Sequence, residues 1–262
     1  MQWSDTIHAE IEAMPKMAFN DALMRRLFGL LDLTSLNDSD TEASVAQFLL
    51  AADGPLGHVA AVCVSPAFVR LAADQMRGSK IHVASVANFP SGEASLTDVL
   101  VEIGRAIEDG ANEIDVVFPY QRYLAGEKQY AQSFIESCKA ACGPDVLLKV
   151  ILETGVLVDL ALIADASFDA LQAGADFIKT STGKVSEGAT IEAAATMLLV
   201  IKHAEQQLKR TCGLKVSGGI RDVQQAAQYL ALTEKIMGAN WATPATFRIG
   251  ASQLAKELLK AL

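Results

Sequence analysis

The stretch Asp176-Phe177-Ile178-Lys179-Thr180-Ser181-Thr182-Gly183-Lys184 runs from an apolar segment into small polar residues and a glycine. The turn signal Ala173-Gly174 precedes it, so its apolar part is interpreted as a strand. Lys179 then lies at or near the strand's C-terminal end. Ligands of alternating strand-helix proteins bind at the carboxyl ends of the strands, so this amine is a candidate reaction centre. For a single lysine, a solvated position where a strand reaches the surface is the more common alternative.

The rest of the chain alternates in the same way between apolar segments and segments with helical spacing of apolar residues. The predicted strands are 28–34, 58–64, 80–87, 113–119, 145–152, 175–178, 213–217 and 235–239. The predicted helices between and after them are 42–52, 66–76, 95–108, 128–141, 159–173, 191–209, 223–231 and 252–262. Almost continuously apolar strands are typical of a parallel sheet wrapped by helices. We therefore predict a single α/β domain over residues 1–262, a (β/α)8 TIM barrel with an N-terminal helical cap over 1–27.

An open, doubly wound sheet has the same strand-helix alternation and is the alternative architecture. Such sheets often carry a glycine-rich dinucleotide fingerprint directly after the first strand. Here Phe28-Gly29-Leu30 places a glycine too early, and no G-x-G-x-x-G follows it. The closed barrel is therefore preferred.

Hydrophobic residues make up 51% of the 262-residue chain and charged residues 20%. This balance is typical of a globular enzyme and excludes a disordered chain. The sequence has no apolar run near the roughly 20 residues that a membrane-spanning helix needs, and its N-terminus lacks a signal-peptide pattern. We therefore expect a cytoplasmic protein that makes no membrane contact.

The net charge of −9 argues against nucleic-acid partners, because binding a phosphate backbone requires a basic face. A few local lysines can still form a positive pocket for a small anionic substrate. The spacing of the four cysteines is not that of a zinc site, so no metal is predicted and reduced thiols are expected. These cysteines are Cys63, Cys138, Cys142 and Cys212.

Five predicted strands carry an ionisable residue near their middle or C-terminal end: Asp32, Asp115, Lys149, Lys179 and Lys215. Strands buried on both faces are usually apolar, because an unpaired buried charge is costly. In a closed barrel such side chains point to one interior, so we expect a polar cluster beneath the C-terminal rim. Buried ion pairs without chemistry are the alternative, particularly for Asp32 and Lys149. Ionisable groups gathered in a cleft are more often functional.

Lysine is a nucleophile only as the free amine, and its usual pKa of about 10.4 keeps it protonated at pH 7. Burial and a neighbouring cation both lower that pKa, and Lys215 is expected to be the cation beside Lys179. A neutral lysine attacks an aldehyde or ketone to form a Schiff base, while Asp115 is suited to moving protons. The cluster therefore predicts Schiff-base chemistry at Lys179.

Three glycine-containing segments follow the last predicted strands: Gly183-Lys184, Ser217-Gly218-Gly219 and Gly250-Ala251-Ser252. Loops at these positions, together with a helix N-terminus, form the usual phosphate cradle of a TIM barrel. Each signal is weak alone, because Gly-Gly is often only a tight turn and Ser252 could be a plain N-cap. Their shared placement predicts a phosphate site.

Several segments together resemble the class I deoxyribose-phosphate aldolase family, over nearly the whole chain from about residue 27. The residues around Lys179 resemble that family's Schiff-base strand. The other matching segments are Leu31–Asp38, Glu113–Tyr120, Leu147–Thr154, Gly213–Lys215 with Gly218-Gly219, Gly238–Trp241 and Phe247–Ser252.

The resemblance implies reversible cleavage of 2-deoxy-D-ribose 5-phosphate to acetaldehyde and D-glyceraldehyde 3-phosphate, in deoxyribose and deoxyribonucleotide catabolism. No cofactor or metal is implied, and the family often forms homodimers. By match, Lys179 would form the Schiff base, Lys215 would lower its pKa, and Asp115 would act as acid and base. The implied substrate-binding residues are Asp32 and Cys63 in the sugar pocket, Lys149 in the charge network, Thr182, and, around the phosphate, Gly183, Lys184, Gly218, Gly219 and Ser252.

The sequence departs from the family pattern at a few positions. Val216 and Ser217 stand where Pro and Ala are common, and Gln253 stands where a second serine often follows Ser252. An aldolase for another phosphorylated sugar and a catalytically silent phosphosugar-binding protein are the alternatives. The intact set Lys179, Asp115 and Lys215 counts against the silent protein.

Overall fold

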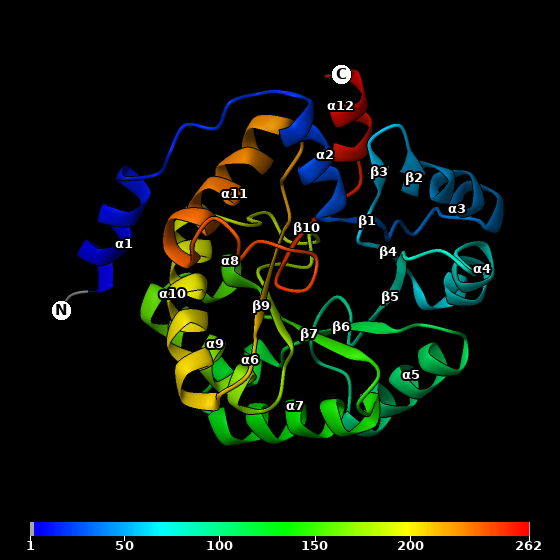
Figure 1. Cartoon of the computed structure of the whole chain (residues 1–262). Helices are drawn as coiled ribbons and strands as arrows, with labels where there is room; N and C mark the ends of the chain where they lie inside the picture. Colours follow the sequence, from blue (N-terminus) through cyan, green and yellow to red (C-terminus); the bar gives the residue numbers. More distant parts are fainter. Residues whose placement is uncertain (1–2, 262) are drawn as a thin grey trace.

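The computed structural model describes residues 3–261, and within this range eight parallel strands close into a barrel (Figure 1). Consecutive barrel strands are neighbours, and β1 pairs with both β10 and β4 to close the ring. The predicted TIM barrel is confirmed. The barrel strands are β1 (Leu31–Ser35), β4 (Ala61–Val64), β5 (His82–Ala87), β6 (Glu113–Val117), β7 (Leu147–Ile151), β8 (Phe177–Lys179), β9 (Gly213–Ser217) and β10 (Phe247–Ala251).

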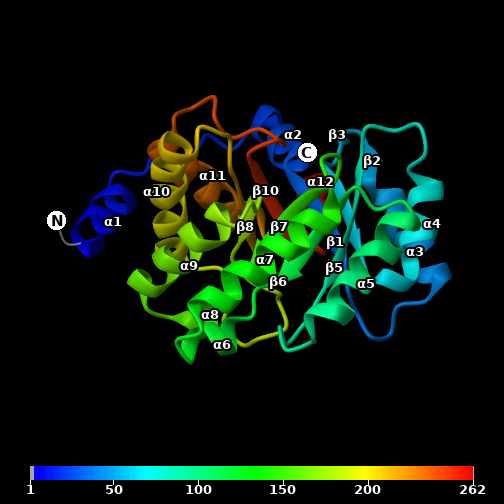
Figure 2. The ribbon, with the colours of Figure 1, turned by 90° about the horizontal axis from the view of Figure 1, so that it is seen from below.

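A helix follows each barrel strand, and these helices surround the barrel, as the two ribbon views show (Figures 1 and 2). They are α3 (Glu42–Leu49), α4 (Val69–Gln75), α5 (Leu96–Glu108), α7 (Lys128–Cys142), α9 (Leu160–Gln172), α10 (Ile191–Leu208), α11 (Val223–Met237) and α12 (Leu254–Lys260). Shorter elements lie in the connections: α6 (Tyr120–Leu124), α8 (Thr154–Leu157), the 3-10 turns Leu50–Ala52 and Pro66–Phe68, and the small hairpin of β2 (Asp53–Gly54) and β3 (Gly57–His58).

Side-chain caps fix where several of these helices begin. Ser95, Asp159, Thr190 and Asp222 each accept a hydrogen bond from the backbone N–H three residues further on. Such a cap satisfies one of the N–H groups that a helix leaves unpaired at its start. The loops between strand ends and helix starts are therefore held at defined lengths.

Successive residues of a barrel strand alternate between the apolar core outside the barrel and the charged barrel interior. In β6, Ile114 and Val116 belong to the apolar core, whereas Glu113 and Asp115 contact charged residues of other strands across the barrel. Successive side chains of a strand point to opposite faces, so one strand serves both environments. The hydrophobic contacts with the helices hold the barrel closed around a charged interior.

The prediction of the last strand, at residues 235–239, was wrong. Residues 235–237 form the final turn of α11, which is longer than predicted, and Gly238 follows it with φ of +101°. The true eighth strand is β10, where Arg248 and Gly250 interrupt the apolar pattern that marks the other strands. Gly250 is needed for close packing, because a Cβ there would lie 2.9 Å from the Cβ of Ser217.

The N-terminal extension consists of two helices, α1 (Trp3–Glu12) and α2 (Asp21–Gly29), with the predicted break between them. Helix α1 lies outside the helical ring against α10 and α11 (Figure 1). Helix α2 continues to Gly29, and the first strand therefore begins at Leu31 rather than at residue 28. The predicted domain ends at residues 1–2 and 262 lie outside the described residues.

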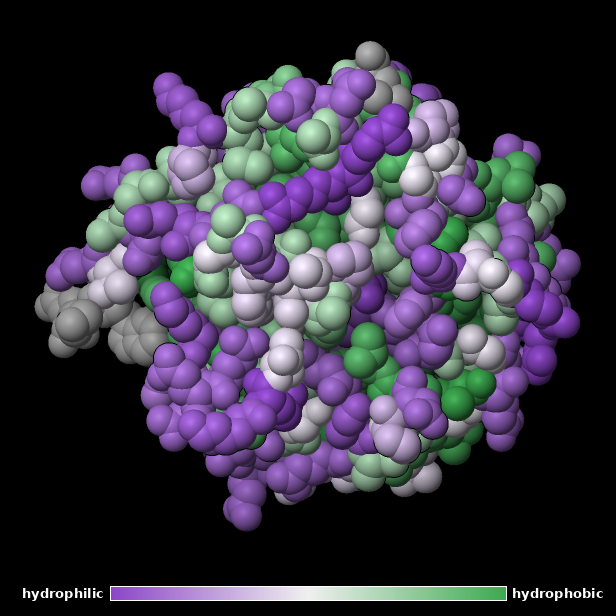
Figure 3. Space-filling model, in the orientation of Figure 1, coloured by the Kyte–Doolittle hydropathy of each residue, from purple (hydrophilic) through white to green (hydrophobic). Residues whose placement is uncertain are grey.

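Hydrophilic residues cover most of the face seen in Figure 3, and apolar residues appear between them in smaller patches. Within residues 3–261, no helix is long and apolar enough to cross a membrane.

Candidate active site

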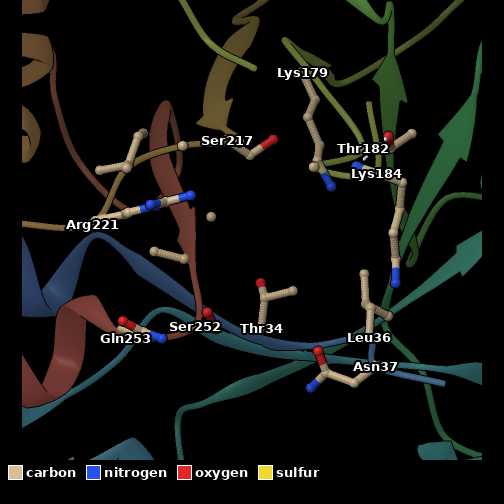
Figure 4. A pocket seen from close by; sticks show the side chains of 16 residues that line it. Thr34, Leu36, Asn37, Lys179, Thr182, Lys184, Ser217, Arg221, Ser252 and Gln253 are labelled. Carbon is tan, nitrogen blue, oxygen red and sulfur yellow. Dashed lines mark hydrogen bonds between the residues drawn. The ribbon is translucent and has the colours of Figure 1, made fainter. Parts of the chain in front are cut away.

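A cavity of about 530 Å³ opens at the C-terminal ends of β1, β8, β9 and β10 (Figure 4). The barrel therefore carries its cavity at the end where the βα loops gather, as TIM barrels usually do. Six predicted substrate-binding residues line it: Thr182, Gly183, Lys184, Gly218, Gly219 and Ser252. Lys179 lines it as well, and its side chain points into the open space (Figure 4).

Lys179 is the last residue of β8, and only 2% of its surface is exposed. Its Nζ donates a hydrogen bond to Asp115 Oδ2 at 2.9 Å. Burial lowers the pKa of Lys179, and the charge of Lys215 lowers it further, against the opposing pull of Asp115. The amine thus combines contact with the cavity and a bias towards the uncharged, nucleophilic form.

Lys215 lies beside Lys179 on the adjacent strand, where the two residues are paired in register. Its Nζ donates to the same oxygen, Asp115 Oδ2, at 2.7 Å and contacts Asp32 Oδ2 at 2.6 Å. Burial opposes the charge of Lys215, but these two carboxylates outweigh it and raise the pKa of Lys215. Lys215 is therefore the charged partner of the lysine pair.

Asp115 joins the two lysines to a wider buried network. Its Oδ1 accepts a hydrogen bond from Lys149 at 2.7 Å, and Lys149 also contacts Glu113 Oε2 at 2.6 Å. Although burial alone would raise the pKa of Asp115, the three lysines Lys149, Lys179 and Lys215 hold it well below its usual value. Asp115 is thus an ionised carboxylate that accepts hydrogen bonds from three amines.

Arg248 completes the network from β10. Its guanidinium donates to Asp32 Oδ1 at 2.7 Å and to Glu113 Oε1 at 2.8 Å. The sequence interpretation included neither Glu113 nor Arg248 among the buried charges. The available signal was the same as for the other charges, an ionisable residue inside a strand, but Arg248 lay in a segment not recognised as a strand.

Asp32 and Cys63, which the resemblance placed in the sugar pocket, lie beneath the cavity, as does Lys149, which it placed in the charge network. Asp32, Cys63 and Lys149 are completely buried in the barrel interior and do not line the cavity. Thr34, two residues beyond Asp32 on the same face of β1, lies on the cavity wall instead. Burial raises the pKa of the Cys63 thiol. Asp32 and Lys149 belong to the charge network beneath the cavity rather than to its surface.

Glu153 holds the loop that follows Lys179. It directly precedes α8, has φ of +56°, and is completely buried. Its carboxylate accepts hydrogen bonds from the backbone N–H of Thr182 at 3.2 Å and from the Thr182 hydroxyl at 2.5 Å. The Thr182 hydroxyl in turn accepts a hydrogen bond from the backbone N–H of Lys184 at 3.0 Å. Glu153 was not predicted, and it fixes the position of Gly183 and Lys184.

The loop after β9 is built for close approach of backbone groups. Gly218 and Gly219 have φ of +89° and +81°, which favour glycine, and a Cβ on Gly218 would lie 2.9 Å from Gly188 Cα. The Ser217 hydroxyl donates to the Ser181 carbonyl at 2.6 Å, which ties this loop to the one after β8. Glycines with exposed N–H groups and an adjacent positive charge are suited to holding a phosphate.

The cavity wall contains further residues that the sequence interpretation did not select. Arg221 follows the Gly218-Gly219 turn, and Figure 4 shows its guanidinium pointing towards the middle of the cavity. Asn37 and Leu36 line the opposite part of the wall. A cation two residues after a glycine pair was a usable signal for Arg221, whereas Leu36 and Asn37 lie in an ordinary loop sequence.

Among the described residues, no group of three or more His, Cys, Asp or Glu side chains is arranged to hold a metal ion. The carboxylates of the barrel interior are instead paired with lysines and an arginine.

A parallel barrel with a buried amine at the base of a phosphate-suited cavity is a scaffold for chemistry on carbonyl compounds. The family model described as "DeoC/LacD family aldolase" matches residues 26–252. The chain therefore belongs to the DeoC/LacD family of aldolases, which are carbon–carbon lyases.

The chain is also similar to several solved structures. A candidate deoxyribose-phosphate aldolase from Toxoplasma gondii ME49 is 27% identical over 92% of this chain and 94% of that chain, with a TM-score of 0.83. Another candidate from Coccidioides immitis is 26% identical over 99% of this chain and 96% of that chain, with a TM-score of 0.79. The deoxyribose phosphate aldolase of Aeropyrum pernix, described as tetrameric, is 24% identical over 98% of this chain and 97% of that chain, with a TM-score of 0.75. At that last identity the likeness shows the fold alone.

Proposed function

We propose that this aldolase reversibly cleaves 2-deoxy-D-ribose 5-phosphate to acetaldehyde and D-glyceraldehyde 3-phosphate through a Schiff base on Lys179. The observation that carries the proposal is one shared oxygen. Asp115 Oδ2 lies 2.9 Å from the Lys179 nitrogen and 2.7 Å from the Lys215 nitrogen, directly beneath a cavity suited to phosphate.

The first half of the reaction forms the Schiff base. The neutral Lys179 amine attacks the C1 aldehyde of the open-chain sugar, and loss of one water from the carbinolamine gives a protonated imine. Lys215 is charged and hydrogen-bonded within this site, so it can supply the proton that the departing water requires. Asp115 holds both amines in position while the proton moves.

The second half of the reaction breaks the C2–C3 bond. Removal of the proton from the C3 hydroxyl turns C3 into the aldehyde of glyceraldehyde 3-phosphate, and the electrons of the C2–C3 bond pass to the iminium as an enamine. Protonation of the enamine at C2, followed by addition of water, releases acetaldehyde and restores Lys179. We assign these proton transfers to the Asp115 and Lys215 pair, acting directly or through a bound water.

The phosphate group is expected at the other end of the cavity. Backbone N–H groups of Gly183, Gly218 and Gly219 and the hydroxyl of Ser252 offer hydrogen bonds, while Lys184 and Arg221 supply positive charge. This anion site would set the substrate's orientation, with its C1 carbonyl directed at Lys179. Such fixed orientation is a major source of rate acceleration.

Borohydride trapping tests the Schiff base. Incubation with acetaldehyde and sodium borohydride should add one reduced two-carbon unit to Lys179, located by peptide mass spectrometry. Lys179→Leu is the negative control, and Lys202→Leu on α10, remote from the site, is the matched lysine control. A wild-type protein that gains no adduct at Lys179 would favour a silent phosphosugar-binding protein.

The substrate is tested separately, by a panel of phosphorylated sugars with glyceraldehyde 3-phosphate production as the readout. Deoxyribose 5-phosphate should be the best substrate, with turnover unchanged by a metal chelator. Faster cleavage of another phosphorylated sugar would leave the aldolase assignment intact and replace the substrate.

We further propose that the protein acts in the cytoplasm in deoxyribose catabolism and forms a homodimer. The Aeropyrum pernix relative is described as tetrameric, so the assembly is a point of difference worth measuring. Light scattering coupled to gel filtration distinguishes a mass of two chains from one or four.

A further inference from the structure

The barrel interior contains a network of seven charged or chargeable residues in direct contact with one another. The network consists of Asp32, Glu113, Asp115, Lys149, Lys179, Lys215 and Arg248. The three carboxylates match the three cations other than Lys179. The network is therefore neutral when Lys179 is a free amine and carries one excess positive charge when Lys179 is protonated.

We propose that Arg248 and Glu113, which do not line the cavity, are positioning residues that set this balance and so determine the protonation state of Lys179. The proposal rests on the proposed Schiff-base function, because it explains how the nucleophile is kept uncharged. In this proposal the whole network acts on Lys179, whereas in a simple lysine pair Lys215 alone would repel a charge on Lys179.

The contacts of Lys215 show why a lysine pair is insufficient. Its nitrogen touches two carboxylates, Asp115 at 2.7 Å and Asp32 at 2.6 Å, which offset its field at Lys179. Asp32 is shared in turn with Arg248 at 2.7 Å. The repulsion that Lys179 experiences therefore depends on the whole set of charges, and Arg248 makes the cations equal to the carboxylates.

The directions of the pKa shifts agree with this account. Despite burial, the pKa values of Asp32, Glu113 and Asp115 are all lowered by their neighbouring cations. Despite burial, those of Lys149, Lys215 and Arg248 are all raised by the carboxylates. Lys179 alone among the seven is shifted towards its neutral form, with burial as the largest cause.

Other titratable groups face the network from neighbouring elements. Cys63 on β4 faces Lys179 and Lys215, and burial raises the pKa of its thiol. Glu153, between β7 and α8, interacts with Lys179 through its charge, but its hydrogen bonds go to Thr182. His82 on β5 contacts Glu113 Oε1 at 2.7 Å, and its side chain is 45% exposed. These three residues are kept in the variants below, although Glu113→Gln replaces the carboxylate that His82 contacts.

Two single variants change the balance in opposite directions. Arg248→Met removes one cation, so protonating Lys179 would restore neutrality and its pKa should rise. Glu113→Gln removes one carboxylate, so a charge on Lys179 becomes less favourable and its pKa should fall. The double variant removes one of each, and Arg248→Lys keeps the charge, so both should titrate like the wild type.

The readout is acylation of Lys179 by acetic anhydride across pH 6 to 10, followed by peptide mass spectrometry, because only the neutral amine reacts. For a unit charge changed at about 10 Å in a medium of effective dielectric constant about 20, the inflection moves by about one pH unit. Below the inflection, labelling of Arg248→Met should therefore fall about tenfold, and labelling of Glu113→Gln should rise about tenfold.

Acylation requires no aldehyde chemistry, so it separates this inference from the proposed function. Opposite shifts in the single variants and a restored profile in the double variant support the balance. Shifts in the same direction, or none, overturn it even if borohydride trapping succeeds. If circular dichroism shows that Arg248→Met does not fold, Glu113→Gln decides, and an unmoved inflection in that variant overturns the inference.

Discussion

Replacing Lys215 by leucine tests the electrostatic environment of the proposed nucleophile. Lys179 and Lys215 both lie within hydrogen-bonding distance of Asp115 Oδ2, at 2.9 Å and 2.7 Å. Two unit charges about 5 Å apart, at an effective dielectric constant of about 20, repel by about 3 kcal/mol, which corresponds to about two pKa units. Leucine keeps the site apolar, so burial continues to act on Lys179 while this repulsion is lost. The pKa of Lys179 should therefore rise by about two units.

The measurement is kcat/KM for deoxyribose 5-phosphate as a function of pH. A higher pKa means that the neutral amine appears at higher pH, so the acid limb of the Lys215→Leu profile should move in the alkaline direction. Below both inflections the variant should be about 100-fold slower, and the deficit should shrink as the pH rises. A lower plateau at high pH would report the loss of proton transfer. An acid limb that stays at the wild-type position, with Lys202→Leu as the control, would refute the electrostatic reasoning.

The remaining predictions concern stability, phosphate binding and loop position. Lys179→Leu should abolish turnover yet keep the melting temperature close to that of the wild type, because it removes an uncharged group. Asp115→Ala should lower the free energy of unfolding, measured by chemical denaturation, by about 3 to 5 kcal/mol, because it leaves buried amines without their carboxylate. Arg221→Ala should raise KM for deoxyribose 5-phosphate at least tenfold while leaving cleavage of unphosphorylated deoxyribose unchanged; equal losses on both sugars, or a similar effect of the exposed Arg77→Ala, would contradict a phosphate contact. Glu153→Ala should destabilise the protein by about 1 to 3 kcal/mol, because it leaves the Thr182 N–H without its partner, and should raise KM more than it lowers kcat; a pure kcat effect would assign Glu153 to the chemical step instead.

The alternation of the chain made the fold predictable. Seven of the eight barrel strands lie within or close to their predicted ranges, because buried parallel strands produce continuous apolar runs between turn signals. The eighth failed for a physical reason. Arg248 in β10 faces the charged interior, so the strand lacks that run, while Ile236 and Met237 at the end of α11 imitate it.

The charged residues within strands predicted where the site would be, but not its internal contacts. The five charged residues of the predicted cluster meet as expected, because closure of the barrel brings side chains of similar height together. Which amine contacts which carboxylate depends on strand register and barrel geometry, which no local pattern encodes. The pairing of Arg248 with Asp32 joins the last barrel strand to the first and appears only when the barrel is closed.

Residues on the cavity wall were predictable where a glycine-containing segment follows a strand or where the family resemblance covers them. Gly218 and Gly219 were predicted from their place after a strand, and their positive φ angles explain why glycine stands there. Asn37 and Leu36 reach the cavity through the path of the loop after β1, and either residue is ordinary in any loop. Glu153 was overlooked because its buried position depends on Thr182, a residue from a different loop.

The charged interior is better explained by chemistry than by stability. Replacing buried ion pairs with packed apolar side chains is often neutral or stabilising, so seven such residues are not needed to hold a barrel together. Burial also favours the uncharged form of Lys179, although Asp115 acts against it. In the proposed reaction, however, an isolated neutral amine would have no group beside it to protonate the hydroxyl that leaves the carbinolamine or to accept the proton of the C3 hydroxyl. The network supplies proton carriers without adding net charge near Lys179, and that combination requires carboxylates and cations in equal number.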